Sequence, residues 1–212
     1  LSDGIDLSVG SIFALSAIIC AQLIMAGLPA VLCVILALIA GTILGGVSGI
    51  LVTKGRLQAF IATLITMTAY RGIAMIITNG KPISRLAESI SSEGGSFFFK
   101  ALGKGNLAFS GNTSIRFPIP ALILILVFVI FYFILNRTTF GRRIYATGSN
   151  AKCAKLVGVH TDTVKIIVYS ISGFLSSLPG LIMLSRLHSA LPTLADCSAP
   201  APPPASPFAR HA

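Results

Sequence analysis

Five long apolar stretches, separated by polar connections, dominate the pattern of the 212-residue chain. In order, they cover residues 7–26, 29–52, 59–78, 117–135 and 164–184. Each is close to the ~20 residues that a helix needs to cross about 30 Å of hydrocarbon. The stretches are continuous rather than alternating, which favours helices over barrel strands. The pattern predicts an all-α protein, a polytopic transmembrane helical bundle with about five spans.

The composition supports a lipid environment. Hydrophobic residues make up 54% of the chain and charged residues only 10%, whereas soluble domains carry about 25% charged residues. Mean hydropathy is +0.89. A water-soluble protein of this size could not bury so much apolar surface in one core, so membrane lipid is the expected solvent and partner.

The formal net charge of +10 would suggest nucleic acid as a partner if the protein were soluble. Here the basic residues mostly flank the apolar stretches and form no basic stripe with interleaved aromatic residues. The tendency of positive charge to stay on the cytoplasmic side explains them better, and nucleic acid is not an expected partner.

The charged connections also predict an orientation. Residues 53–58 include Lys54 and Arg56, and residues 136–163 hold five basic residues against one acid. Two spans separate these connections, so both are expected on the cytoplasmic side. Residues 79–116 are then external. The three phenylalanines at positions 97–99 lie in this external part, either along the membrane interface or packed on the helices.

The chain is expected to divide into a partial transmembrane domain, residues 1–196, and a Pro- and Ala-rich tail, residues 197–212, which is expected to be disordered. The four cysteines show no CxxC spacing and are interpreted as small, reduced, apolar side chains. No cofactor, metal ligand set or catalytic residue is predicted. No GxxxxGK[ST] motif occurs, so any ATP hydrolysis is expected on a separate chain, and this chain is not expected to be an enzyme.

Three glycines in the second stretch, Gly41, Gly45 and Gly49, recur every four residues. They would form a flat stripe on one helix face and let a neighbouring helix approach closely. The alternative is the ordinary enrichment of glycine in membrane helices. The register of the three residues favours helix packing.

Polar residues mark two places where a solute could pass. Asp6 and Ser8 precede the first stretch, where a helix start offers N–H groups and a positive dipole end to a solute. A simple cap of that helix is the alternative reading of Asp6. Arg71 lies deep in the third stretch and should face protein or water, either binding solute hydroxyls or pinning neighbouring helices.

A short helix is predicted in the second basic connection. Asn150 is a favourable N-cap, residues 151–156 favour helix, and Gly158 fits a left-handed stop. Flexible turns are expected on both sides of this helix. It would lie on the cytoplasmic surface, where it could dock a soluble partner or be an ordinary surface helix.

Five motifs together resemble the permeases of bacterial sugar-importing ABC transporters. They are GIDLSVGS (4–11), KGRLQAFIATL (54–64), Arg71-Gly72 followed by TNG (78–80), FGRRIYATGSN (140–150) and KLVGV (155–159). The resemblance extends to about residue 196 and is strongest to the ribose-importing members. It implies a monosaccharide substrate, with ribose the leading expectation.

The resemblance also implies a location in the bacterial inner membrane and three partners: a second permease copy or a related one, a cytoplasmic ABC ATPase, and a periplasmic sugar-binding protein. Gly148, Asn150, Ala154 and Gly158 map onto the ATPase-contacting loop of the family, which usually carries an acid where this chain has Ala151. The family has a further span before Gly4 and several after residue 193, so we expect a truncated chain. A proton- or ion-coupled carrier and a non-functional truncated permease are the alternatives.

Overall fold

The computed structural model describes residues 5–83, 106–108 and 116–190. The phenylalanines at 97–99 and the tail at 197–212 lie outside these residues. The helices, in chain order, are α1 (Val9–Met25), α2 (Ala30–Thr53), α3 (Ala59–Thr78), α6 (Ile119–Arg137), α7 (Thr139–Ser149), α8 (Ala151–Leu156) and α9 (Thr161–Leu187). Two short antiparallel strands, β1 (Asn106–Ala108) and β2 (Arg116–Pro118), precede α6.

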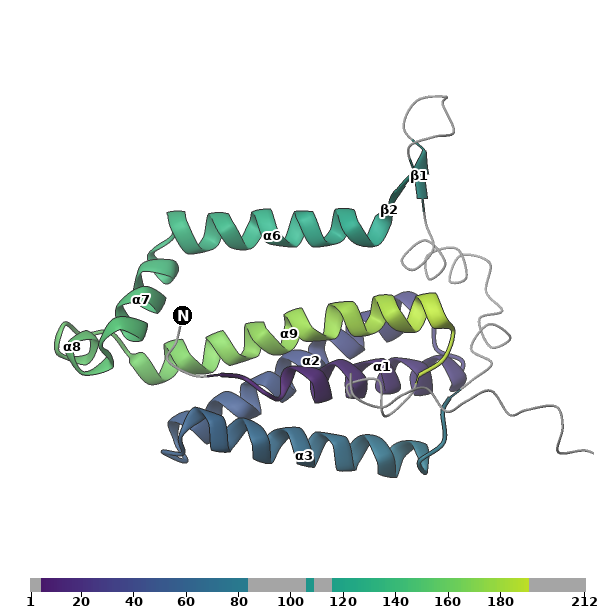
Figure 1. Ribbon diagram of the computed structural model, residues 1–212, viewed down its shortest axis with the longest axis horizontal. Helices are drawn as coiled ribbons and strands as arrows, with labels where there is room; N and C mark the ends of the chain where they lie inside the picture. The colour runs from purple at the N-terminus through teal and green to yellow at the C-terminus, as the bar shows by residue number, and fades with distance from the viewer. Residues whose placement is uncertain (1–4, 84–105, 109–115, 191–212) are drawn as a thin grey trace, which may run out of the picture.

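The predicted helical membrane bundle is confirmed. Within the described residues, α2, α3, α6 and α9 are long and apolar enough to cross a membrane, and α1 is a shorter apolar helix. All five observed helices begin and end within three residues of the predicted stretches. Helix α1 is the exception to a full membrane span. It has only 17 residues and starts inside the bundle rather than at its end (Figure 1).

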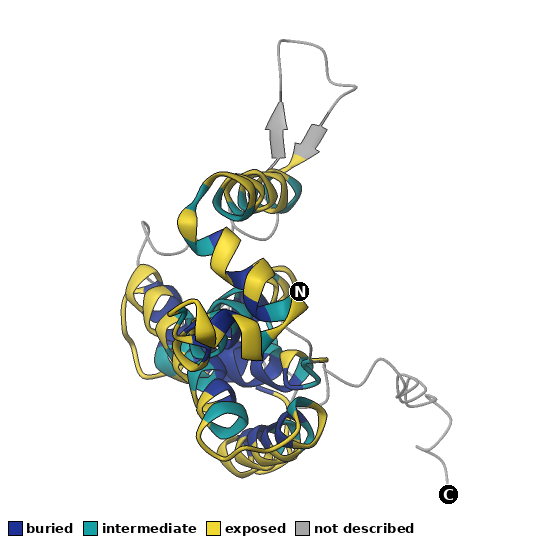
Figure 2. Cartoon of the chain, turned by 90° about the vertical axis from the view of Figure 1, so that its left-hand side faces the viewer, coloured by how far each residue is buried: buried dark blue, intermediate teal, exposed yellow. Residues whose placement is uncertain are grey.

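Helix α1 forms the centre of the core. It packs against α2, α3 and α9, and Ile12, Leu15 and Ile18 are almost completely buried. In Figure 2, buried positions gather in the middle of the helix cluster, while exposed positions face outward. Many of the outward positions are large apolar side chains, such as Ile43, which is 60% exposed. This inverted surface is expected of a protein whose solvent is lipid.

Helix α6 runs alongside α9 (Figure 1) but has no buried residue. It leads directly into α7 and α8, which lie beside the start of α9 at one end of the bundle. The α2–α3 connection, with Lys54 and Arg56, lies at this same end (Figure 1). Both basic connections therefore emerge at what we call the basic end of the bundle.

A pair of backbone hydrogen bonds closes the opposite end. Ile83, after α3, and Ala190, after α9, each donate a backbone N–H to the other's carbonyl oxygen over 2.9 Å. Both residues are buried. The bridge holds the ends of α3 and α9 together.

Candidate functional site

The residues before α1 form a polar cluster around one carboxylate. Asp6 Oδ1 accepts hydrogen bonds from the Ser8 backbone N–H over 3.0 Å and from the Ser8 hydroxyl over 2.6 Å. Its second oxygen, Oδ2, accepts a hydrogen bond from the Ser172 hydroxyl on α9 over 2.8 Å. The N-cap residue of α1 is Ser8, two residues after Asp6, the residue considered as a cap from the sequence. The carboxylate therefore ties the start of α1 to α9.

This carboxylate lies near the middle of the bundle. Ser172 is 11 residues from the first residue of α9 and 15 from the last. At a rise of about 1.5 Å per residue, these separations are about 16 Å and 22 Å. The positive end of the α1 dipole and the negative Asp6 side chain thus meet at membrane depth, where a charge needs polar partners.

Helix α3 supplies two further hydroxyl groups. Thr63 Oγ1 lies 3.2 Å from the Ile5 carbonyl oxygen, to which it donates a hydrogen bond, so α3 holds the segment that leads into α1. The buried Tyr70 hydroxyl donates to the Leu44 carbonyl oxygen of α2 over 2.7 Å and lies 3.4 Å from Ser48 Oγ. These contacts connect α3 to both the polar cluster and α2.

The three candidate solute-path residues do not lie together: Asp6 and Ser8 precede α1, whereas Arg71 is on α3. Asp6 and Ser8 are bonded to each other, and Ser8 is fully buried. Arg71 is partly buried on α3, one residue after Tyr70. Its contribution to a solute path stays a prediction.

The candidate packing glycines lie against α9. A Cβ added to Gly41 would come within 2.6 Å of Ser177 Cβ, and one added to Gly49 within 2.9 Å of the Ile166 Cα. A Cβ added to Gly45 would strike the Tyr169 carbonyl oxygen and lie 2.9 Å from the Gly173 Cα. Helices α2 and α9 therefore meet backbone to backbone, which only residues without a side chain permit.

The short helix predicted in the basic connection is confirmed as α8, with the predicted bounds. Asn150 Oδ1 accepts hydrogen bonds from the backbone N–H groups of Lys152 and Cys153 over 3.0 and 3.1 Å. Gly158 has the expected positive φ of 86°. Ala154 is buried, whereas Leu156 and Val157 are 87% and 83% exposed. Helix α8 thus presents an apolar tip outside the bundle.

The flexible turn expected before Asn150 is wrong. Gly148 lies inside α7, an amphipathic helix that buries Gly141, Ile144 and Thr147 and exposes Arg142 and Arg143. Thr138 caps α7 by accepting the Gly141 N–H over 3.3 Å. The recurrence of the buried positions every three residues was the available signal, and the basic residues between them mask it.

The cysteines contribute no further site within the described residues. Cys20 and Cys33 are buried within the core, and Cys153 is exposed on α8. Cys197 lies outside the described residues. Among the residues that the structure describes, no group of three or more His, Cys, Asp or Glu side chains could hold a metal ion.

Sequence reasoning missed the partners of the Asp6 cluster. Ser172 and Thr63 are 166 and 58 residues away from the residues they bond. Serine and threonine are common in membrane helices because they can bond the carbonyl of the preceding turn, so neither residue stood out. Only the packing of α3 and α9 around α1 brings them together.

These features define a class: an integral membrane protein with a charged helix start inside its bundle and a capped short helix outside it. The chain matches the family of the branched-chain amino acid transport system, permease component, over residues 1–201, and it belongs to that family.

Among its curated relatives are two ribose import permease proteins. That of Haemophilus influenzae is 43% identical over 190 residues, which cover 90% of this chain and 55% of the relative. That of Bacillus subtilis is 43% identical over 196 residues, covering 92% and 56%. An autoinducer 2 import system permease protein of Photorhabdus luminescens is 34% identical over 187 residues, covering 88% and 52%.

The chain spans about half the length of these curated relatives. No solved structure matches it. The bacterial permease relatives and the span-length helices together place the chain in the bacterial inner (cell) membrane.

Proposed function

We propose that this chain forms part of the membrane-spanning permease subunit of an ATP-driven importer for a monosaccharide, with ribose as the first candidate. The observation that carries the proposal is the 43% identity to two ribose import permease proteins over nine-tenths of this chain. The autoinducer 2 relative is less similar, at 34% identity, and therefore supports that substrate less.

The polar cluster at the start of α1 suits a sugar. The Asp6 carboxylate can accept hydrogen bonds from sugar hydroxyls, and the hydroxyls of Ser8 and Ser172 can both donate and accept them. The hydroxyls of Ser8 and Ser172 each donate a hydrogen bond to the Asp6 carboxylate near mid-depth. The hydroxyl groups of a passing sugar could replace the serine hydroxyls as donors to Asp6. The carboxylate would then keep its hydrogen bonds in a low-dielectric environment.

Helix α8 suits coupling to a cytoplasmic ATPase. Its N-cap bonds and the buried Ala154 hold it as a rigid piece, and Leu156 and Val157 offer an apolar contact. Gly148, Asn150 and Gly158 fix its two ends through α7, the cap and the positive-φ turn. A second permease copy and a periplasmic sugar-binding protein complete the proposed assembly.

One observation favours a second candidate, an ion- or proton-coupled carrier. Such carriers commonly use a carboxylate within the membrane. Sequence reasoning put Arg71 deep in the third stretch, and the hydrogen bond from Ser172, near the middle of α9, to Asp6 adds a carboxylate at similar depth in support of this candidate. The two candidates differ in their energy source, which an uptake assay can separate.

The test uses a chimera in which residues 5–190 replace the matching region of the Bacillus subtilis ribose import permease. Uptake of labelled ribose is measured in cells that lack their own ribose permease but retain the other components of the system. We expect uptake that fails on ATP depletion and survives an uncoupler, and that falls at least ten-fold in Asp6→Ala. Uptake that follows the proton gradient supports the coupled carrier instead. A stable, membrane-inserted chimera without ribose uptake contradicts ribose as the substrate.

A cross-linking experiment tests the docking role of α8. Lys152→Cys, in a background with Cys153→Ser, places one thiol on the exposed side of α8. We expect a cross-link to the ATPase subunit. The matched variant Lys54→Cys, exposed in the α2–α3 connection at the same end of the bundle, reports general nearness of the ATPase to that end. Co-purification of the ATPase without a cross-link from α8 would contradict this docking site.

A further inference from the structure

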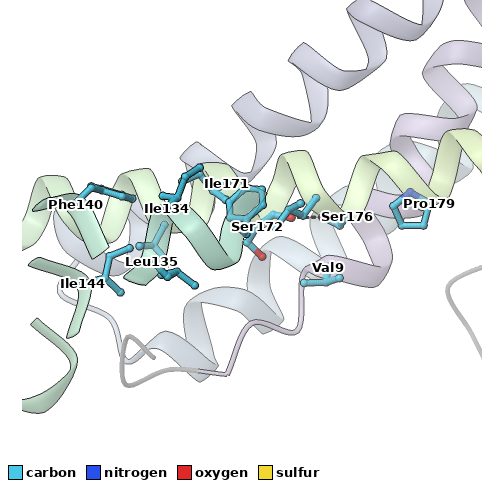
Figure 3. A pocket seen from close by; sticks show the side chains of 12 residues that line it. Val9, Ile134, Leu135, Phe140, Ile144, Ile171, Ser172, Ser176 and Pro179 are labelled. Atoms are coloured by element: carbon cyan, nitrogen blue, oxygen red, sulfur yellow. Dashed lines mark hydrogen bonds between the residues drawn. The ribbon is translucent and has the colours of Figure 1, made fainter. Parts of the chain in front are cut away.

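A cavity of about 400 Å³ lies between α6, α7 and α9. Its walls come from all three helices (Figure 3) and are mostly apolar, with Ile134 and Leu135 of α6, Ile144 of α7, and Ile171 and Pro179 of α9. Ser172 and Ser176 of α9 are the polar residues that line it. Helix α6, which forms one wall, has no buried residue. The cavity therefore needs an apolar occupant, because water would find almost no hydrogen-bonding partner along it.

The length of this cavity matches one leaflet of a bilayer. Along α9 it extends from Val168 to Pro179, a separation of 11 residues. At about 1.5 Å per residue this is about 16 Å. Half of a hydrocarbon core of about 30 Å is about 15 Å. The cavity thus has about the length of one acyl chain. Because it extends past Ser172, near the middle of the bundle, the end of such a chain would cross mid-depth.

A second cavity, of about 340 Å³, lies next to the first at the basic end of the bundle. Phe140 lines both, so the two are neighbours. The second is more polar than the first, because Arg143, His160 and Thr163 line it together with apolar side chains. A mostly apolar cavity at membrane depth thus borders a half-polar cavity at the basic end.

The charge around the second cavity is positive. Arg143 lines it, and within the described residues no acidic side chain forms an ion pair with Arg143. The nearby acid, Asp162, pairs with Lys155 instead: its Oδ1 lies 3.5 Å from the Lys155 Nζ, and both side chains are exposed. Helix α7 buries Ile144 and exposes its arginines, the arrangement of a helix that lies at a membrane surface.

We propose that the two cavities form one binding site for an anionic glycerophospholipid of the leaflet at the basic end. One acyl chain fills the apolar cavity between α6 and α9, and the phosphodiester lies in the polar cavity beside Arg143. The arginine supplies charge and directed N–H donors to the phosphate oxygens. Ser172 of the polar cluster also lines the apolar cavity, so the two sites are neighbours, but the lipid measurements below require no transport of any solute.

The headgroup is tested by native mass spectrometry on the purified, delipidated chain in detergent. Phosphatidylglycerol and phosphatidylcholine with the same acyl chains are added separately. We expect stronger binding of phosphatidylglycerol and, in Arg143→Gln, about a five-fold loss of that binding with no change for phosphatidylcholine. Arg142→Gln is the matched control, because Arg142 carries the same charge on the same helix but does not line the cavity. Equal losses in both variants would overturn a specific headgroup site.

The acyl chain is tested by filling the apolar cavity. Ile171→Trp should lower the number of bound lipids, whereas Leu126→Trp should not, because Leu126 is 60% exposed on α6 outside the cavity. Unchanged lipid binding by a folded Ile171→Trp would overturn the proposal.

A photoreactive residue identifies the occupant directly, even if the tryptophan variant does not fold. A benzophenone amino acid at Phe131, which lines the apolar cavity, keeps the aromatic ring that is already there. We expect phospholipid adducts on irradiation in native membranes. Cross-links to polypeptide instead of lipid would show that a protein segment occupies the cavity and would overturn the lipid site.

Discussion

Adding a single methyl group to the α2–α9 interface should destabilise the protein, and a second glycine provides the comparison. Gly45→Ala places a Cβ against the backbone of α9 at Tyr169 and Gly173. Gly72→Ala places a Cβ on α3 with no other atom within 4 Å. Both positions lie inside helices, so both variants gain about the same 0.5–1 kcal/mol from replacing glycine in a helix.

The difference between the two variants therefore isolates the steric clash. Overpacking a tight interface costs about 1–3 kcal/mol. The Gly45 contacts are to backbone atoms rather than to the end of a flexible side chain, so relief requires the two helices to separate. For a chain of this size, 1 kcal/mol corresponds to a shift of about 2–4 °C in Tm. Gly45→Ala should melt roughly 2–12 °C below Gly72→Ala.

The chain provides its own assay for this comparison. Cys20 and Cys33 are fully buried, so a thiol-reactive dye reports their exposure on unfolding in detergent. Cys153→Ser and Cys197→Ser remove the thiol exposed on α8 and the one in the C-terminal tail. A Gly45→Ala melting temperature equal to or above that of Gly72→Ala would refute the inference that backbone contact between α2 and α9 stabilises the bundle.

Three smaller predictions use the same dye assay, with hydrogen exchange for local effects. Asp6→Ala leaves the Ser172 hydroxyl without its carboxylate partner and should cost about 1–3 kcal/mol; no loss would show that the cluster does not stabilise the bundle. Asn150→Ala removes the cap and should lower the local stability of α8 by about 1 kcal/mol, which speeds amide exchange there; Ser149→Ala should leave the exchange unchanged. Tyr70→Phe removes a hydroxyl that bonds an α2 carbonyl and should cost about 1 kcal/mol; an unchanged melting temperature would contradict this.

The spans were predictable because one local signal determines them. A continuous apolar stretch of about 20 residues has one low-energy arrangement in lipid, and its length fixes where the helix ends. Helix α8 was predictable for a similar reason, since Asn150 is a local start signal and Gly158 a local stop signal. The amphipathic α7 was missed because two adjacent arginines interrupt its short periodic pattern.

The candidate site could be predicted only in part. Asp6 is conspicuous because a charge next to an apolar stretch needs a partner. Its partner, Ser172, is one of several serines in α9, and no local rule selects it from the others. Likewise, the stripe of Gly41, Gly45 and Gly49 predicts that some helix approaches, but which helix it is depends on packing across more than a hundred residues.

The tight α2–α9 contact also predicts which parts of the bundle move together. A Cβ at Gly46 would lie 2.9 Å from the Ser170 Oγ, so Gly46→Cys with Ser170→Cys suits a disulfide. Helices α2 and α9 meet backbone to backbone, whereas single side-chain hydrogen bonds hold the segment before α1 to α9 and α3. Motion should therefore occur in the segment before α1 rather than between α2 and α9. We expect the oxidised double variant, placed in the ribose permease chimera without other cysteines, to keep its uptake, as should each single variant. Uptake that is lost on oxidation and restored by a reductant would show that α2 and α9 separate during transport.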